Sequence, residues 1–391
     1  MLVKLCKCVE RLIHYRAMRL FQSVLMASIL GSVAQFAMAQ VMYVGTYTEG
    51  TSKGIYAYKY DPKTGKLNSM GLMAATPDPT FLALHPNGKY LYAVNEVNKF
   101  EGQTAGSVTA YSIDKATGKL TQLNQVSTKS PGPCHLIVDP TGKTLLVANY
   151  AGGSFVSFPI GTDGKLGEAT SFIQEHGTGP NKQRQEQAHG HSVNLPKSNK
   201  FMLGADLGTD KIWIFDLDAA KATITPKGSA SVKPGSGPRH LVIAPDQKHV
   251  YVLNEMASAV TAFEFDPATA AMKEIAMVSA LPAGFKGEST GAEIQIDAAG
   301  KYVYSSNRGD DSIAVFAVDP KTGNLSLIQN QSTGGKQPRA FVLDPSGKFL
   351  ICGNQATNTI TTFKVDPATG KLTATGDKYD LGAPVTFVFV K

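Results

Sequence analysis

The stretch Gly237-Pro-Arg-His-Leu-Val-Ile-Ala-Pro-Asp-Gln-Lys-His-Val-Tyr-Val-Leu-Asn-Glu255 decides the fold, because it predicts a complete β-hairpin. Leu241 to Ala244 forms a short apolar strand, and a turn headed by Pro245 follows it. Val250 to Leu253 returns as a strand rich in β-branched and aromatic residues. A hairpin brings its outer ends together, so the polar residues flanking the two strands are expected to share one edge.

The same hairpin template recurs along the chain. Five further copies lie at residues 79–96, 133–150, 189–206, 291–308 and 338–355. Their starts are about 45–55 residues apart, a period typical of propeller blades. Asn ends the second strand in five of the six copies, which favours a structural role for its amide in the adjoining turn.

A turn of the form Asp-Pro-x-Thr-Gly-x-Leu counts the repeats independently. Clear copies lie at residues 61–67, 114–120, 319–325 and 366–372, and weaker ones at 161–166, 216–224 and 266–273. The glycine supplies the positive φ that such a tight turn needs. Each turn follows a third strand and precedes a weaker outer one, so each repeat contains four antiparallel strands. Seven such units in a ring predict an all-β, seven-bladed β-propeller with almost no helix.

The two ends of the chain are expected to close this ring together. Pro384 to Val390 supplies the innermost strand of the seventh blade, and Val41 to Tyr47 supplies the second. Ile55 to Tyr60 and Leu72 to Ala75 then complete that blade. Sharing a blade in this way removes the open strand edges that an unclosed array exposes. An open solenoid is the alternative, and the shared blade disfavours it.

Residues 1–39 are interpreted as a signal peptide and residues 40–391 as the propeller domain. A basic region precedes the apolar segment Leu20–Phe36, and Ala37-Met38-Ala39 has the small-residue pattern of a cleavage site. The basic region is long for a signal, so translation could start at Met18 instead of Met1. We expect cleavage after Ala39, a periplasmic or secreted location, and no stable membrane insertion afterwards. An uncleaved membrane anchor is the alternative.

Charge and cysteine content exclude several functional classes. The whole chain carries a formal charge of +7, but residues 40–391 hold 33 basic and 30 acidic side chains, a net charge of +3. This is too mild to indicate nucleic-acid binding. Cys134 and Cys352 lie in different repeats and do not form a disulfide framework. Cys and His show no metal-site spacing, so neither a metal nor another cofactor is expected.

The propeller geometry gathers the hairpin ends around one mouth of the central channel. Channels of this kind are common ligand sites. The ionisable residues expected there are Glu96, His135, His189, His191, Asp206, Arg239, His240, Glu255, Glu293, Arg308 and Arg339, with Cys134 and Tyr150 beside them. They are expected on a face of the molecule, outside its core.

His189 and His191 stand out in this set. Residues two apart in a strand face the same way, so both side chains could point into the mouth. They follow an irregular polar segment, Gln174 to Gln187, which would overhang the mouth or form a solvated insertion. His135 and His240 occupy matching positions, which is more typical of packing between blades. His85 and His249 are expected to be plain surface residues on the opposite face.

Arginines mark the remaining mouth residues. Arg239, Arg308 and Arg339 present planar guanidinium groups suited to a carboxylate or phosphate. Ion pairs with Glu96, Glu255 and Glu293 are the structural alternative. The arginines therefore favour an anionic or hydroxyl-rich small-molecule ligand.

Taken together and in order, five stretches resemble the lactonase family of seven-bladed propellers. They are His189-Gly-His-Ser-Val193, Asp206-Leu-Gly-Thr-Asp210, Gly237-Pro-Arg-His240, Leu253-Asn-Glu255 and Ser306-Asn-Arg-Gly309. That family includes propeller-type 6-phosphogluconolactonases and fungal carboxymuconate-lactonizing enzymes. The resemblance extends from about residue 41 to the C-terminus.

The resemblance implies which residues act and what they do. His191, Arg239 and Glu255 match the family's proposed catalytic group, and Arg308 matches a further anion contact. His189, Arg339, Glu96 and Glu293 are added from the mouth geometry as substrate-binding residues. The general base could be Glu255 or His191.

Three functional hypotheses follow. The first is a lactonase of the 6-phosphogluconolactonase type, which adds water to a sugar lactone such as D-glucono-1,5-lactone. The second is a carboxymuconate-lactonizing cycloisomerase, which would use the same groups for proton transfer. The third is a propeller that acts as a binding scaffold without catalysis. An exported protein would not meet a cytosolic phosphorylated lactone, so the phosphorylation state of the substrate stays open.

Overall fold

The computed structural model describes residues 40–390, and the predicted signal peptide with its cleavage site lies outside the described residues. Within residues 40–390 the structure contains strands, turns and loops, and no helix there is long and apolar enough to cross a membrane. The strands form seven antiparallel sheets of four strands each. The predicted all-β, seven-bladed propeller is therefore confirmed.

Each sheet is one blade, and in six of the seven blades the order of the strands in space follows the chain. The first blade after the N-terminal strands contains β4 (Leu82–Leu84), β5 (Tyr90–Asn95), β6 (Ser107–Ile113) and β7 (Leu120–Ser127). The next three contain β8 (Pro133–Val138), β9 (Thr144–Asn149), β10 (Ser154–Pro159), β11 (Ser171–Gln174); β12 (Gly190–Asn194), β13 (Phe201–Asp206), β14 (Lys211–Asp218), β15 (Thr223–Ser231); and β16 (Pro238–Ile243), β17 (His249–Asn254), β18 (Ala259–Phe265), β19 (Met272–Ser279). Two further blades contain β20 (Thr290–Ile296), β21 (Tyr302–Arg308), β22 (Ser312–Val318), β23 (Leu325–Ser332); and β24 (Pro338–Leu343), β25 (Phe349–Asn354), β26 (Thr359–Val365), β27 (Leu372–Asp380).

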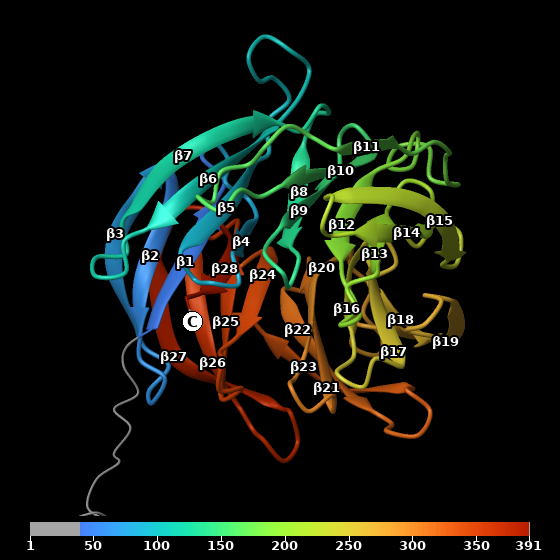
Figure 1. The fold of residues 1–391 in the computed structure, drawn as a ribbon. Coiled ribbons are helices and arrows are strands. Elements are labelled where there is room, and N and C mark those ends of the chain that lie inside the picture. Colours follow the sequence, from blue (N-terminus) through green and yellow to red (C-terminus); the bar gives the residue numbers. More distant parts are fainter. Residues whose placement is uncertain (1–39, 391) are drawn as a thin grey trace, which may run out of the picture. The chain divides into compact units, whose positions relative to one another are not determined.

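The seventh blade is built from both ends of the described chain. Its order is β28 (Pro384–Phe389), β1 (Gln40–Thr46), β2 (Gly54–Tyr60) and β3 (Leu67–Ala75). Met42 pairs with Phe389 and Val44 with Phe387, in antiparallel register. The predicted shared blade is thus confirmed. The inner strand β28 contacts β24 on one side and β4 on the other, which closes the ring shown in Figure 1.

The core lies between neighbouring blades, where each sheet packs one face on the next. One apolar cluster, for example, joins Tyr251, Leu253 and Val260 of one blade to Val303 and Phe316 of the following blade. Six comparable clusters complete the ring of interfaces among the described residues. Large aromatic side chains fill these interfaces, and burial of each contributes on the order of 2–3 kcal/mol.

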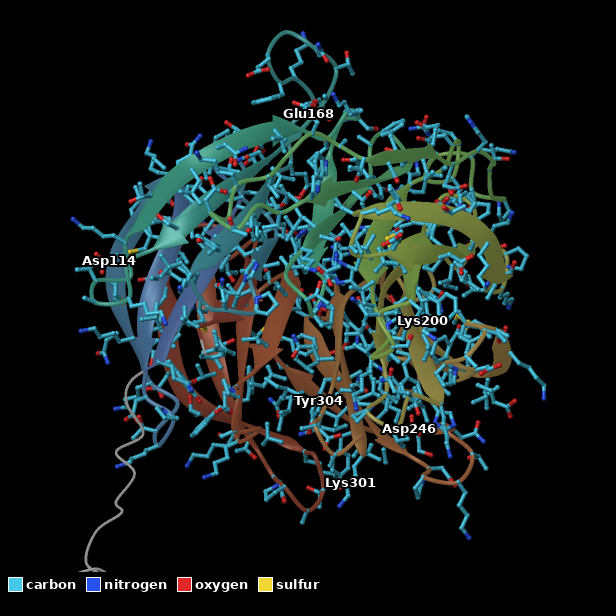
Figure 2. All side chains as sticks on the ribbon, in the orientation of Figure 1. Asp114, Glu168, Lys200, Asp246, Lys301 and Tyr304 are labelled. Carbon is cyan, nitrogen blue, oxygen red and sulfur yellow. The ribbon has the colours of Figure 1, made fainter. Side chains whose placement is uncertain are left out.

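A repeated contact joins four of the seven turns to the blade before them. The Tyr304 hydroxyl, labelled in Figure 2, donates to the carbonyl oxygen of Gly370 in the next blade at 2.9 Å. Tyr251 donates in the same way to Gly323, and Tyr92 to Gly164. The aromatic ring at the start of the preceding blade's second strand occupies the space that a Cβ would need at four turn glycines with φ between +68° and +81°, which are Gly65, Gly164, Gly323 and Gly370. The Asp-Pro-x-Thr-Gly turn therefore also serves as an inter-blade contact.

Two sequence expectations about polar residues have opposite outcomes. The strand-ending asparagines are fully buried and structural: Asn254 Nδ2, for example, donates to Thr261 Oγ1 at 2.8 Å. The expectation of plain surface residues at His85 and His249 is wrong. His85 bonds the carbonyl oxygen of Gly142 in the next blade at 2.9 Å, and the His249 ring lies against Gly323. Both imidazoles pack between blades because a bare glycine leaves room for a flat ring.

Candidate functional site

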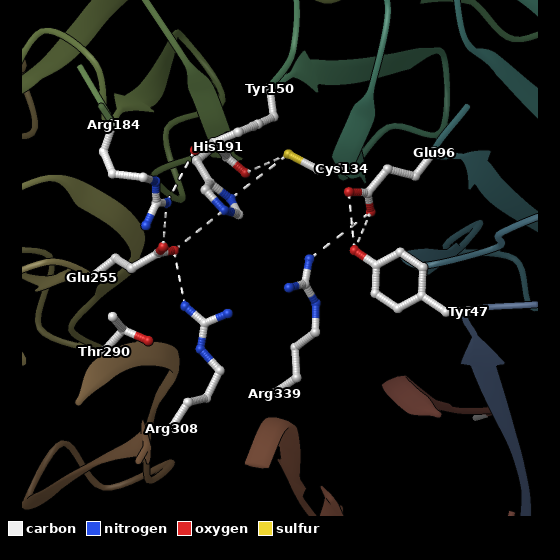
Figure 3. A pocket seen from close by; sticks show the side chains of 10 residues that line it. All are labelled: Tyr47, Glu96, Cys134, Tyr150, Arg184, His191, Glu255, Thr290, Arg308 and Arg339. Atoms are coloured by element: carbon white, nitrogen blue, oxygen red, sulfur yellow. Dashed lines mark hydrogen bonds and ion pairs between the residues drawn. The ribbon is translucent and has the colours of Figure 1, made fainter. Parts of the chain in front are cut away.

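The mouth of the channel contains a cavity of about 280 Å³ to which every blade contributes. The inner strands begin, and the second strands end, on this face, as the hairpin repeat predicts. Figure 3 shows the ten lining residues, which are Tyr47, Glu96, Cys134, Tyr150, Arg184, His191, Glu255, Thr290, Arg308 and Arg339.

Glu255 is the centre of one wall of this pocket. Its Oε1 lies 2.7 Å from Arg184 Nη2. Its Oε2 lies 3.0 Å from Arg239 Nε and 3.2 Å from Arg308 Nη2. Burial alone would raise the pKa of Glu255, but the three guanidinium groups lower it to about 2. The carboxylate is therefore ionised at neutral pH, and it has little tendency to accept a proton.

His191 lies between Glu255 and a buried thiol. Its Nε2 is 3.7 Å from Glu255 Oε2, and its Nδ1 is 3.7 Å from Cys134 Sγ. The thiol also donates to the His191 carbonyl oxygen at 3.3 Å. Burial and the charge of Arg239 lower the pKa of His191 well below its usual range, so the imidazole is neutral at pH 7. A neutral, pocket-lining imidazole can accept a proton.

The opposite wall is formed by Tyr47, Glu96 and Arg339 (Figure 3). The Tyr47 hydroxyl donates to Glu96 Oε1 at 3.0 Å, and Thr80 Oγ1 donates to Glu96 Oε2 at 2.5 Å. The Arg339 guanidinium lies over the Tyr47 ring, 5.1 Å from its centroid. Its Nη2 is 3.9 Å from Glu96 Oε2, which is too long for a hydrogen bond. Arg339 is thus held loosely and remains free to bind an anion.

Arg239 lies behind the pocket wall. Its side chain is 3% exposed, and Nη1 contacts both the Ala292 carbonyl oxygen and His240 Nε2. The structure brings Arg239 next to Glu255, as the hairpin predicts, but it is not among the residues that line the cavity.

The two histidines of the His-Gly-His stretch do not point the same way, so the expected alternation is wrong here. A register shift between Gly190 and Ser192 interrupts the pairing of β12 with β13. This irregularity breaks the two-residue period that both side chains would have needed. His191 lines the pocket, whereas the His189 ring stacks on Tyr150 at 4.6 Å and bonds the Tyr150 carbonyl oxygen at 2.9 Å.

Glu293 also lies away from the mouth pocket. It lines a second cavity of about 260 Å³ further along the channel, together with Phe81, His135 and His240. Pairing of β20 with β21 shifts register between Gly291 and Ile294, so Glu293 falls in an irregular part of its strand. His135 and His240 face the channel, with ring centroids 5.1 Å apart.

The expected exposure of the central residues is wrong as well. Arg239 is 2%, Glu255 4% and His191 5% exposed, so all three are buried. The strand ends converge on a narrow channel, and the segment Gln174 to Gln187 covers part of it. Removing one member of such a buried ion cluster leaves other charges unpaired, which is costly to stability.

Sequence reasoning missed three lining residues, Tyr47, Arg184 and Thr290. Arg184 belongs to the irregular segment Gln174 to Gln187, whose overhang of the mouth is confirmed because Arg184 contacts both Glu255 and the Tyr150 hydroxyl. The only signal was a basic residue in a loop already expected there. Tyr47 follows β1 at the position that Glu96 and Glu255 occupy in their blades, so aligning the seventh blade with the others would have found it.

Positive charge exceeds negative charge in this site. Arg184, Arg308 and Arg339 line the cavity with Glu96 and Glu255, and Arg239 adds a fourth guanidinium behind it. Burial and neighbouring guanidinium groups lower the pKa of Arg308 to about 10, so it stays charged at pH 7. Its buried Nε has no hydrogen-bond partner within residues 40–390. The Nε atom itself is inaccessible, but the guanidinium group of Arg308 lines the cavity, where its positive charge suits a ligand oxygen that carries negative charge.

Comparisons with known proteins give one consistent picture. A family model described as "Lactonase, 7-bladed beta-propeller" matches residues 41–389. A 6-phosphogluconolactonase of Bacillus subtilis (strain 168) is 39% identical over 300 residues, covering 77% of this chain and 84% of that protein. A 6-phosphogluconolactonase of Formosa agariphila is 37% identical, covering 77% and 86%. The solved structure of a periplasmic gluconolactonase from Pseudomonas aeruginosa is 30% identical, with a TM-score of 0.84 over 90% of this chain and 99% of that one.

Proposed function

The chain belongs to the lactonase family of seven-bladed β-propellers, and from that premise we propose that it hydrolyses a sugar lactone of the glucono-1,5-lactone type at the channel mouth. The observation that carries this proposal is the pairing of a neutral imidazole with surplus guanidinium groups in one pocket. Lactone hydrolysis needs a base for water and a positive site for the oxyanion. His191 supplies the first, and Arg308 and Arg339 supply the second.

His191 acts as the general base. Of the acceptors around the Cys134 thiol, the His191 carbonyl oxygen is the nearest at 3.3 Å, and we assign the thiol hydrogen to it. With that assignment the sulfur accepts Nδ1–H, and Nε2 keeps its lone pair. Nε2 takes a proton from water as the water oxygen attacks the lactone carbonyl. When the ring opens, the imidazolium returns that proton to the departing alkoxide oxygen. One water is consumed, and a hydroxy acid is formed.

Glu255 supports this cycle as a fixed anion. Its lowered pKa makes it a poor base, so of the two bases that the sequence left open we propose His191. The carboxylate lies 3.7 Å from Nε2, where it stabilises the imidazolium that forms during the reaction. It also holds Arg184 and Arg308 at the pocket wall.

The arginines select the substrate and stabilise the oxyanion. The guanidinium groups of Arg308 and Arg339 both line the cavity, and Arg339 Nη2 lies as far as 3.9 Å from Glu96 Oε2, so both groups can contact ligand oxygens. We propose that one guanidinium contacts the lactone carbonyl oxygen and the other a carboxylate, phosphate or hydroxyl group elsewhere on the ring. Arg239 and His189 have supporting roles, since Arg239 holds Glu255 and His189 stacks on Tyr150.

A lactone panel tests the function. The purified protein is assayed by acid release with D-glucono-1,5-lactone, its 6-phosphate and a muconolactone, with the spontaneous rate subtracted. Catalysed hydrolysis of either sugar lactone supports the proposal, and the ratio of the two kcat/KM values shows which charge state is preferred. Activity on the muconolactone alone would select the cycloisomerase. A rate equal to the blank on all three substrates would favour the binding scaffold.

We also propose that residues 1–39 are removed on export and that residues 40–391 act as a soluble periplasmic or secreted domain. The Ala37-Met38-Ala39 pattern supports this proposal. Mass spectrometry of the exported protein should find a mature N-terminus at Gln40. An intact leader on a cytosolic protein would contradict the proposed location and make a phosphorylated substrate more plausible.

A further inference from the structure

Below the mouth pocket, the channel contains a second set of buried ionisable groups that the proposed mechanism does not use. His135, His240 and Glu293 line the inner cavity of about 260 Å³, and the Phe81 ring packs on His135 at 4.0 Å. Their side chains are nearly inaccessible, since His240 is 7% and Glu293 13% exposed. Burying ionisable groups lowers the stability of the fold unless each group has a hydrogen-bond or charge partner. The partners of these three residues therefore indicate their functional role.

These contacts form a continuous chain that leads to the mouth. Glu293 Oε1 lies 3.2 Å from His240 Nδ1. His240 Nε2 lies 3.1 Å from Arg239 Nη1, and Arg239 Nε lies 3.0 Å from Glu255 Oε2. Glu255 faces His191 at the other end.

The donors and acceptors along this chain can be assigned. A guanidinium can only donate, so His240 Nε2 must present its lone pair to Arg239. The hydrogen of the neutral ring is then on Nδ1, and it is donated to Glu293 Oε1. Burial and the charge of Arg239 lower the pKa of His240 well below its usual range, which agrees with a neutral ring.

We propose that His240 and Glu293 are positioning residues for lactone hydrolysis: Glu293 sets the tautomer of His240, and His240 holds Arg239 in the orientation that aligns Glu255 with His191. This inference rests on the proposed function of the mouth pocket. It assigns the inner channel a part in catalysis, although none of its groups touches the substrate.

No neighbouring residue can replace His240 as the hydrogen-bond acceptor for Arg239. The charged and titratable groups that face the pair are His135 from β8, His191 from β12, and Arg239, Arg308 and Arg339, with Glu255 beyond them. The cationic groups cannot accept a hydrogen bond from Arg239, and among the described residues its guanidinium group bonds only Glu255, His240 and Ala292, not the neutral rings of His135 or His191. Without His240, Arg239 Nη1 would keep only the Ala292 carbonyl oxygen, and the guanidinium could turn away from Glu255.

Two substitutions at one position separate positioning from packing. His240→Gln places an amide oxygen near the original Nε2 position and so keeps an acceptor for Arg239, whereas His240→Leu fills similar volume without one. We expect His240→Leu to lower kcat by roughly 10- to 100-fold with little change in KM, because misplacement of a supporting group slows the chemical step. We expect His240→Gln to recover most of that loss. Equal kcat values for the two variants, measured per folded protein, would overturn the proposal.

A spectroscopic measurement tests the hydrogen bonds that link Glu293, His240 and Arg239, without relying on activity. In protein labelled with ¹⁵N-histidine, the His240 signals, identified by their loss in His240→Gln, should report a neutral ring with hydrogen on Nδ1 at neutral pH. Glu293→Gln should shift these signals without charging the ring. Hydrogen on Nε2 would overturn the inference even if the lactone panel succeeds. Conversely, inactivity of the wild type on all lactones with the expected spectrum would reject the proposed function and retain the hydrogen-bond chain.

Discussion

At the scale of single residues, the contacts that a side chain makes at the channel mouth depend more on its position in the fold than on its residue type. His189 and His191 are two positions apart, yet one stacks on Tyr150 and the other lines the pocket. Glu96 and Glu255 both directly follow a second strand, yet only Glu255 is paired closely with guanidinium groups. Their different partners assign Glu255 to the imidazole and leave Glu96 as the support of Tyr47.

Substitution of the proposed base is the first test at this scale. His191→Ala should lower kcat by roughly 10²–10⁴-fold, the usual contribution of a general base. Because His191 is buried, the comparison must use equal concentrations of folded protein. His85→Ala is the control: it removes a contact on the opposite face and should leave kcat unchanged. A near-normal rate in folded His191→Ala would place the base elsewhere.

Glu293 predicts a pH dependence of stability. Burial raises the pKa of Glu293 from 4.5 to about 7 in the folded protein. Its contribution to stability is therefore complete below pH 4.5 and lost as the pH rises to about 7, since burying the ionised carboxylate is unfavourable. This shift corresponds to at most about 3 kcal/mol.

Urea unfolding of wild type and Glu293→Gln at about pH 5 and pH 8 checks this prediction. The buried histidines act in the opposite sense, so the two proteins must be compared at each pH. Glu293→Gln should become more stable relative to wild type at the higher pH, by up to about 3 kcal/mol. A stability difference independent of pH would show that Glu293 titrates near its ordinary pKa.

At the scale of elements, the Asp-Pro-x-Thr-Gly turn joins neighbouring blades as well as reversing the chain. Tyr304 of β21 donates to Gly370 in the β26–β27 turn, and the Tyr302 ring lies where a Cβ on Gly370 would be. The glycine is thus required twice, once for its φ of +68° and once for the missing side chain.

A pair of glycine variants separates these two requirements. Gly347 has nearly the same φ, +69°, but a Cβ there would meet nothing within 4 Å. Gly347→Ala should therefore cost only the backbone strain, about 1 kcal/mol. Gly370→Ala should cost that amount plus roughly 1–3 kcal/mol for overpacking against Tyr302. Equal unfolding free energies for the two variants would contradict the proposed contact.

At the scale of the whole molecule, ring closure depends on one pair of strands from opposite ends of the chain. β28 pairs with β1, and its Val385, Phe387 and Phe389 are nine-tenths or more buried. The pocket needs the same closure, because Tyr47 follows β1 directly and Arg339 lies on β24, which contacts β28.

Deletion of the last eight residues, 384–391, tests closure. It should remove the innermost strand, expose the edge of β1 and the apolar cluster around Val44 and Ile351, and produce aggregation or a markedly lower unfolding midpoint. Static light scattering and thermal unfolding would measure both effects. A soluble, monomeric deletion variant with an unchanged midpoint would argue against the shared blade as the clasp of the ring.

The sequence by itself determined the architecture, because architecture depends on local patterns that repeat. The sequence contains alternating strands, turn glycines and a period of about 45–55 residues. Because the pattern occurs seven times, an irregularity in one repeat does not hide it. The same repetition placed Arg239, Glu255, His191, Arg308 and Arg339 at one mouth.

Only the tertiary structure decided what those residues do there. Register shifts at Gly190 and near Glu293 turned one side chain aside and moved another into the inner channel. The partners of Glu255 come from three separate segments, and one of them, Arg184, lies in a loop without any periodicity. Protonation depends on burial and on charges that are distant in sequence, so the choice between Glu255 and His191 required the folded arrangement.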